Sequence, residues 1–150
     1  MIRYLQVVQG KPIAMLTASG NVRKGAPATK DFSDMTVAHD ADGMGPYLID
    51  IAPTYEGLNA IVEPTDDAFE TAESGDIVRV IPTVLGERYA TSEITMDGLS
   101  EGDMLVASAG KFVKASSGQA AWVYCGEYSD PTGIKMGAIE RVEPTAVSGS

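Results

Sequence analysis

Apolar residues occur along the chain in short runs separated by turn residues, and this pattern is clearest from residue 75 onward. Apolar and polar positions alternate there over about four to eight residues, which is typical of strands with one buried face. Residues 99–118 are expected to form a β-hairpin with a Gly-Lys turn. The other strand segments expected in this part are 75–85, 86–95, 120–128 and 133–142.

The beginning of the chain is less regular. Two apolar segments, 3–8 and 12–18, flank Gly10 and predict an opening hairpin. The polar stretch that follows, 19–34, is rich in Gly, Lys and Ala, so it is expected to be a loop or an extended arm.

Two further strands are expected at 35–39 and 46–52, on either side of an acidic turn that contains glycines. Residues 54–75 fit one or two short helical turns with Thr65 as N-cap, but they do not reach the length of a stable amphipathic helix. About eight short strands without a long helix predict an all-β fold, either a small β-sandwich or a jelly-roll or β-barrel-like domain.

The expected organisation is one folded unit with three parts. Residues 1–74 contain the N-terminal hairpin, the arm and a connecting region, residues 75–142 form a compact β-domain, and residues 143–150 form a flexible tail. Gly75 and Gly102 each precede an Asp at the entry to an apolar run, so both are expected at positive φ.

Composition narrows the choice of partners. The chain has 150 residues, of which 44% are hydrophobic, and this suits one folded domain. Its net charge of −10 and its lack of a Lys/Arg cluster disfavour nucleic acid and anionic membranes as partners. No apolar run approaches the length of a membrane span, and no signal-peptide pattern is recognised at the start. The single cysteine, Cys125, excludes an intramolecular disulfide framework and is expected to be a small buried apolar residue.

Residue patterns that carry catalysis or hold metals are weak in this sequence. His39 is the only histidine, and no nucleophile motif accompanies it. One His and one Cys do not make a zinc site. The acidic stretch that starts at Asp40 begins like a calcium loop, but Ile51 stands at its twelfth position, where a bidentate Glu is required. The sequence therefore predicts a protein that is not an enzyme, with no cofactor and no metal ion.

The order of segments in the second half carries a family resemblance. A Gly-Asp entry, a Gly-Lys hairpin ending in "KFVKA", the aromatic strand "AAWVYCGEY" and a last strand "GIKMGAIERV" follow one another. In this order residues 75–142 resemble the small β-domains of tailed-bacteriophage capsid decoration proteins, also called cement proteins. The resemblance implies a structural virion protein, synthesised in the host cytoplasm, that binds the outer capsid surface and bridges neighbouring capsomers to stabilise the head. It also implies a homotrimer, with the major capsid protein as the other partner.

Two groups of residues are candidate capsid or subunit contacts. The N-terminal segment is either an attachment arm or the first core strand, and its apolar residues are Ile2, Tyr4, Leu5 and Val7. The second group lies on the aromatic strand, where alternation places Trp122 and Tyr124 on the same face.

A different class of function uses the same aromatic strand. Trp122, Tyr124 and Tyr128 would provide a stacking surface if the domain were a β-sandwich that binds carbohydrate or another ligand. Composition does not distinguish this ligand-binding module from a capsid decoration protein.

Overall fold

A computed structural model describes residues 1–51 and 70–148, and in these ranges the regular structure is entirely β. The all-β prediction is therefore confirmed. The expected helical turns and the N-cap at Thr65 fall mostly outside the described residues. The strands are β1 (Ile2–Gln6), β2 (Ala14–Ala18), β3 (Val22–Arg23), β4 (Pro27–Asp31), β5 (Thr36–His39), β6 (Tyr47–Asp50), β7 (Thr71–Ala72), β8 (Ile77–Pro82), β9 (Arg88–Thr91), β10 (Met104–Ser108), β11 (Lys111–Lys114), β12 (Gly118–Ser129) and β13 (Lys135–Val147).

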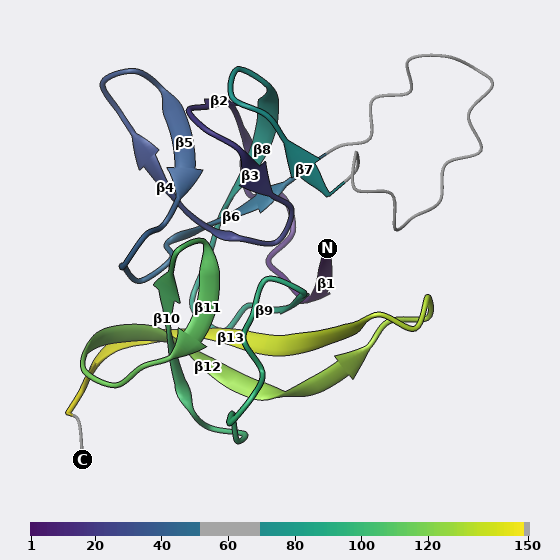
Figure 1. Ribbon diagram of the computed structural model, residues 1–150, viewed down its shortest axis with the longest axis vertical. Helices are drawn as coiled ribbons and strands as arrows, with labels where there is room; N and C mark the ends of the chain where they lie inside the picture. The colour runs from purple at the N-terminus through teal and green to yellow at the C-terminus, as the bar shows by residue number, and fades with distance from the viewer. Residues whose placement is uncertain (52–69, 149–150) are drawn as a thin grey trace.

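The strands form a barrel and a sheet that pack against each other. The barrel is closed in the order β2-β5-β4-β6-β8, and the six-stranded sheet has the order β1-β9-β13-β12-β10-β11. Figure 1 shows the barrel in the upper part of the molecule and the sheet below it, with the short β3-β7 pair beside the barrel. Both the barrel and the sheet take strands from each side of residue 74, so the two expected parts are interleaved in one fold.

The opening hairpin is a wrong prediction. β1 pairs with β9 of the six-stranded sheet, with Ile2 opposite Thr91, whereas β2 pairs with β8 and β5 of the barrel. Both segments are strands, but the connection between them crosses from the sheet to the barrel. Local alternation identifies a strand and does not choose its partner, which is set by packing between distant segments.

The stretch 19–34 is also more ordered than expected, because it contains β3 and β4. β4 pairs with β5, from Ala28 opposite His39 to Asp31 opposite Thr36. Inside the barrel the small side chains of Ala26 and Ala28 are fully buried. The interior of a narrow barrel is filled by small and branched side chains, so this polar-looking segment can supply inward-facing residues.

The hairpin expected at 99–118 is present as β10 and β11, paired from Leu105 opposite Lys114 to Ser108 opposite Lys111. Gly75 and Gly102 have φ of 98° and 92°, as the Gly-Asp pattern predicted. At the C-terminal end, β13 continues to Val147 and pairs there with the beginning of β12, so these tail residues form part of the sheet.

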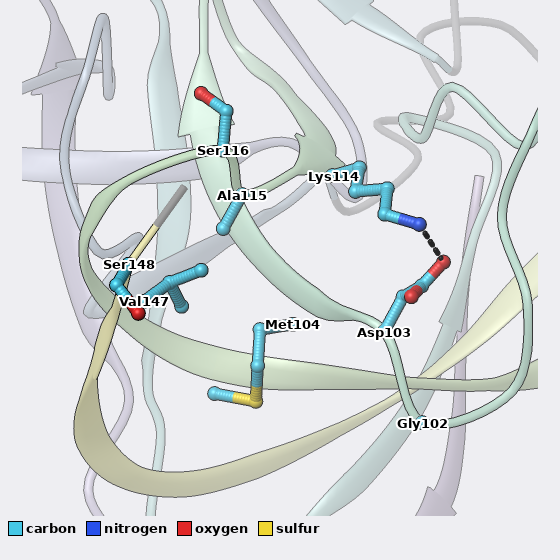
Figure 2. A pocket seen from close by; sticks show the side chains of 8 residues that line it. All are labelled: Gly102, Asp103, Met104, Lys114, Ala115, Ser116, Val147 and Ser148. Atoms are coloured by element: carbon cyan, nitrogen blue, oxygen red, sulfur yellow. Dashed lines mark ion pairs between the residues drawn. The ribbon is translucent and has the colours of Figure 1, made fainter. Parts of the chain in front are cut away.

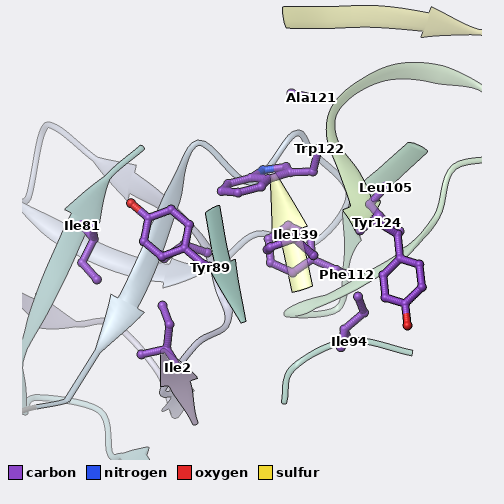
Figure 3. Packing of buried hydrophobic residues seen from close by; sticks show 11 residues of the cluster. Ile2, Ile81, Tyr89, Ile94, Leu105, Phe112, Ala121, Trp122, Tyr124 and Ile139 are labelled. Atoms are coloured by element: carbon purple, nitrogen blue, oxygen red, sulfur yellow. The ribbon is translucent and has the colours of Figure 1, made fainter. Parts of the chain in front are cut away.

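The molecule has two main apolar cores. One fills the barrel with inward residues such as Leu16, Val37 and Val80. The other lies where β6 and β8 of the barrel meet the six-stranded sheet, and Figure 3 shows its aromatic centre. There the Trp122 ring makes edge-to-face contacts with Tyr89 and Phe112, at centroid distances of 6.1 and 5.3 Å. These edge-to-face pairs link β9, β11 and β12 of the six-stranded sheet on the face that meets the barrel.

Candidate functional site

Four of the six predicted contact residues lie in the core between barrel and sheet. Ile2 is 3% exposed, Tyr124 is 7% exposed, Trp122 is completely buried, and Val7 packs against the same cluster (Figure 3). For the N-terminal segment, the pairing of β1 with β9 and the burial of Ile2 favour the first core strand over a loose arm. Only Tyr4 and Leu5 reach the surface, where they are 44% and 39% exposed.

Trp122 joins the barrel to the sheet. Its indole Nε1–H donates to the carbonyl oxygens of Met44 and Gly45, at 3.0 and 3.1 Å, and these residues precede barrel strand β6. The Tyr128 ring lies in a different cluster, with Met1 and Met136, so the three expected rings do not share an exposed face. This arrangement gives no support to sugar stacking on them.

Tyr4 extends from β1 toward the outer side of the barrel. Its hydroxyl donates to Asp50 Oδ2 at 3.1 Å, and burial together with the nearby carboxylate raises the pKa of the phenol. Asp50 is opposite Arg79 on β8, and Arg79 is opposite Met15 on β2. These registers place Met15, Arg79 and Asp50 in one row across the outer side of the barrel, and Tyr4 contacts the Asp50 end of this row.

A buried ionic cluster fixes the neighbouring loops. The Glu87 side chain is almost fully buried and accepts from Lys11 Nζ at 2.6 and 2.7 Å, and from the Tyr89 hydroxyl. It also accepts from the backbone N–H groups of Val8 and Val84. Burial works against ionisation, but these hydrogen bonds outweigh it, so the pKa of Glu87 lies below its usual value.

Large apolar side chains are exposed on β1, β2 and β8 and in the loops next to these strands. On β2 and β8 the even-numbered residues face the barrel interior, so Met15 and Ile77 face outward, 57% and 67% exposed. We call the surface formed by these side chains and their neighbours the β1–β2 surface. Its apolar members are Tyr4, Leu5, Val8, Ile13, Met15, Ile77, Val84 and Leu85.

A strand edge borders the β1–β2 surface. β1 is the last strand of the six-stranded sheet, and no other described strand pairs with its outer side. Because the Ser92 N–H donates to the carbonyl of Met1, alternation along the ladder directs the backbone groups of Ile2 and Tyr4 away from β9. Such groups are suited to pairing with an added strand.

A separate hollow of about 610 Å³ opens between the ends of β10, β11 and β13 (Figure 2). Lys114 Nζ lies 2.8 Å from Asp103 Oδ2 at its side, and this hydrogen bond lowers the pKa of the Asp103 carboxyl. The remaining lining is made of small or apolar groups, including Met104, Ala115 and Val147. The one cation that lines the hollow, Lys114, is thus paired with its one carboxylate, Asp103.

His39 has a structural partner. Its Nε2 accepts the backbone N–H of Arg23 at 3.0 Å, and burial lowers the pKa of the imidazole. No nucleophile in the described part of the chain hydrogen-bonds to it. Cys125 is half-buried rather than fully buried. Within residues 1–51 and 70–148, no group of three His, Cys, Asp or Glu side chains is placed to hold a metal ion.

Six members of the β1–β2 surface were missed by the sequence analysis, among them Met15 and Ile77. In the sequence both faces of β2 and β8 are apolar, so alternation alone does not distinguish the outer face from the inner one.

In residues 1–51 and 70–148, no helix is long and apolar enough to cross a membrane. Comparison of the chain with protein-family models, curated proteins and solved structures finds no match. The functional conclusion therefore rests on the geometry of the chain itself.

Proposed function

We propose that the protein is a structural component of a tailed-phage virion, a homotrimer that binds the outer capsid surface and bridges neighbouring capsomers. Its partners are the major capsid protein and other copies of itself, and it performs no catalysis. The observation that carries the proposal is the β1–β2 surface, an exposed apolar area beside an unpaired strand edge.

The physical argument is that such a surface is costly in water. Side chains such as Met15 and Ile77 are more than half exposed, and large exposed apolar areas are typical of interaction sites. Covering one large apolar side chain contributes about 0.8–1.5 kcal/mol when half of it is already buried. Several such contacts, together with backbone pairing at β1, are enough for a specific interface.

The symmetry of a capsid increases the strength of attachment. A capsid presents many identical sites, and a trimer that engages several of them at once converts modest contacts into strong attachment. The buried ionic cluster around Glu87 and the bridge from Trp122 to the barrel keep the β1–β2 surface rigid. A rigid surface loses little conformational entropy on binding.

The test uses expanded capsids of the phage that encodes this chain, purified without the protein. Wild-type protein is expected to co-sediment with them and to saturate at a fixed number of copies. The double variant Met15→Ser, Ile77→Ser should bind at least about tenfold more weakly, because hot-spot apolar contacts are lost.

A matched control is Met44→Ser, since Met44 is a 37% exposed methionine outside the β1–β2 surface. All three proteins are expected to melt within a few degrees of one another, because the changed side chains face solvent. Failure of the wild-type protein to bind capsids would refute the proposal. Equal binding by the double variant would show that the β1–β2 surface is not the capsid contact.

A further inference from the structure

The hairpin of β4 and β5 ends in an exposed apolar tip on the barrel. Phe32 is 73% exposed and Met35 is 58% exposed, although both are large apolar side chains. Phe32 is the most exposed of the large hydrophobic residues in the described part of the chain. An aromatic ring held in water at a hairpin tip is a typical anchor for a protein interface.

The tip is held in one conformation. Asp31 Oδ1 accepts from the backbone N–H of Ser33 at 2.8 Å and from its hydroxyl at 2.6 Å. Met35 has a φ of 54°, an unusual value for a residue with a side chain. At the base of the hairpin, Ala28 and Val37 are completely buried in the barrel. The Phe32 ring is therefore displayed on a preorganised support.

Acidic groups surround the ring. A hollow of about 470 Å³ lies along the outer side of the hairpin, and its lining includes Phe32, two carboxylates from Asp31 and Asp34, and one cation, Lys30. Hydrogen bonds from Ser33 lower the pKa of Asp31, which keeps this carboxylate ionised. The hairpin thus combines a protruding apolar ring with a hollow that holds two carboxylates and one ammonium group.

The one cation that lines this hollow, Lys30, is already engaged. Lys30 Nζ lies over the Tyr47 ring, 4.2 Å from its centroid. This position is a cation–π contact, which holds the ammonium group on the aromatic face. The two carboxylates beside Phe32 are therefore available to an incoming positive charge.

The charge of the chain argues against a second copy as the occupant. All eleven Lys and Arg residues lie in the described ranges, and eight of them already form ion pairs within the chain. Lys30 and Arg141 lie over aromatic rings, which leaves only Lys111 without such a partner. Two copies with a net charge of −10 each would bring acidic surfaces together at this tip.

We propose that the β4–β5 hairpin is an anchor that inserts Phe32 into an apolar pocket of a foreign protein, while a Lys or Arg from the rim of that pocket enters the hollow beside Asp31 and Asp34. The partner is thus a protein with a base-rimmed apolar pocket. This inference rests on the proposed function, because it assigns that pocket to the capsid surface.

The test measures binding to the same purified expanded capsids. Phe32→Ser should weaken binding by at least about tenfold, as expected for loss of an aromatic anchor. Asp34→Lys should also weaken it, and it should make binding less sensitive to salt because a screened attraction has been removed. Met44→Ser is the matched control and should bind like the wild-type protein.

The outcomes separate the two proposals. If the wild-type protein binds capsids and Phe32→Ser binds with the same affinity, Phe32 is not an anchor, whereas the proposal of capsid binding stands. Absence of wild-type binding would overturn both. Dissociation of the free oligomer by Phe32→Ser, measured by sedimentation, would identify a second copy as the occupant and overturn the foreign partner. Because Phe32 is mostly exposed, its replacement should leave the melting temperature within a few degrees of the wild-type value.

Discussion

Gly110 and Gly102 offer a matched pair for testing the packing between barrel and sheet. Both have positive φ, 79° and 92°, so an alanine at either position would be strained to a similar degree. Their surroundings differ. A Cβ on Gly102 would meet nothing within 4 Å, whereas a Cβ on Gly110 would lie 2.5 Å from Nδ1 and 2.6 Å from Cγ of His39.

The expected costs follow from this difference. Gly102→Ala should lower the free energy of unfolding by about 1–2 kcal/mol, the penalty of a left-handed backbone for a residue with a Cβ. Gly110→Ala should lose about 2–5 kcal/mol, because overpacking against the imidazole adds about 1–3 kcal/mol to the same penalty. For a chain of this length, each kcal/mol corresponds to roughly 2–4 °C in the melting temperature.

Urea denaturation of the two variants gives the comparison, with the midpoint and the slope fitted separately. A double-mutant cycle identifies the cause. His39→Ala alone should cost about 1–3 kcal/mol, because the Arg23 N–H loses its acceptor. In the Gly110→Ala background it should cost less, because removing the imidazole relieves the clash. Equal losses for the two glycine variants, or strict additivity in the cycle, would refute this account of the contact.

Two further predictions concern ionisable groups. Burial holds the pKa of His39 in the folded protein below its usual value of 6.5, so the unfolded chain binds the proton more tightly. The contribution of His39 to stability is therefore complete above about pH 6.5, and stability should decrease as the pH falls toward the folded pKa. His39→Gln keeps a side-chain acceptor without titrating there, so melting curves between pH 7.5 and 5.5 should show a smaller slope for this variant; an unchanged slope would exclude His39 as the cause. Lys11→Met should destabilise the fold by about 3–5 kcal/mol because it leaves Glu87 charged and buried, and Glu87→Gln added to it should recover part of the loss in urea denaturation. No recovery in the double variant would show that Lys11 acts through something other than the charge of Glu87.

The local sequence was sufficient to predict the strands of the second half. Turn residues and alternation placed β8 to β13 in the correct segments, and the Gly-Asp pairs indicated the positive φ of Gly75 and Gly102. These features depend on residues close together in the chain. Local patterns were therefore sufficient to predict both the all-β class and the β10–β11 hairpin.

The pairing of strands was decided by tertiary structure. Nothing near β1 indicates that Ile2 will lie opposite Thr91, and nothing near β2 indicates that Leu16 will lie opposite Val78. Strand partners this far apart in sequence are selected by how the barrel and the sheet bury their faces together. The expectation of a local hairpin failed for this reason.

Tertiary structure also decided which apolar residues remain at the surface. Trp122 and Tyr124 were predicted contacts, but they form part of the core because β6 and β8 cover their face of the sheet. Met15 and Ile77 lie outside because the other face of each strand fills the barrel. The sequence by itself determined where most of the strands run, with β3 and β4 among the exceptions. Closure of the barrel and its packing on the sheet determined which apolar faces remained for a partner, because burial depends on what covers each face.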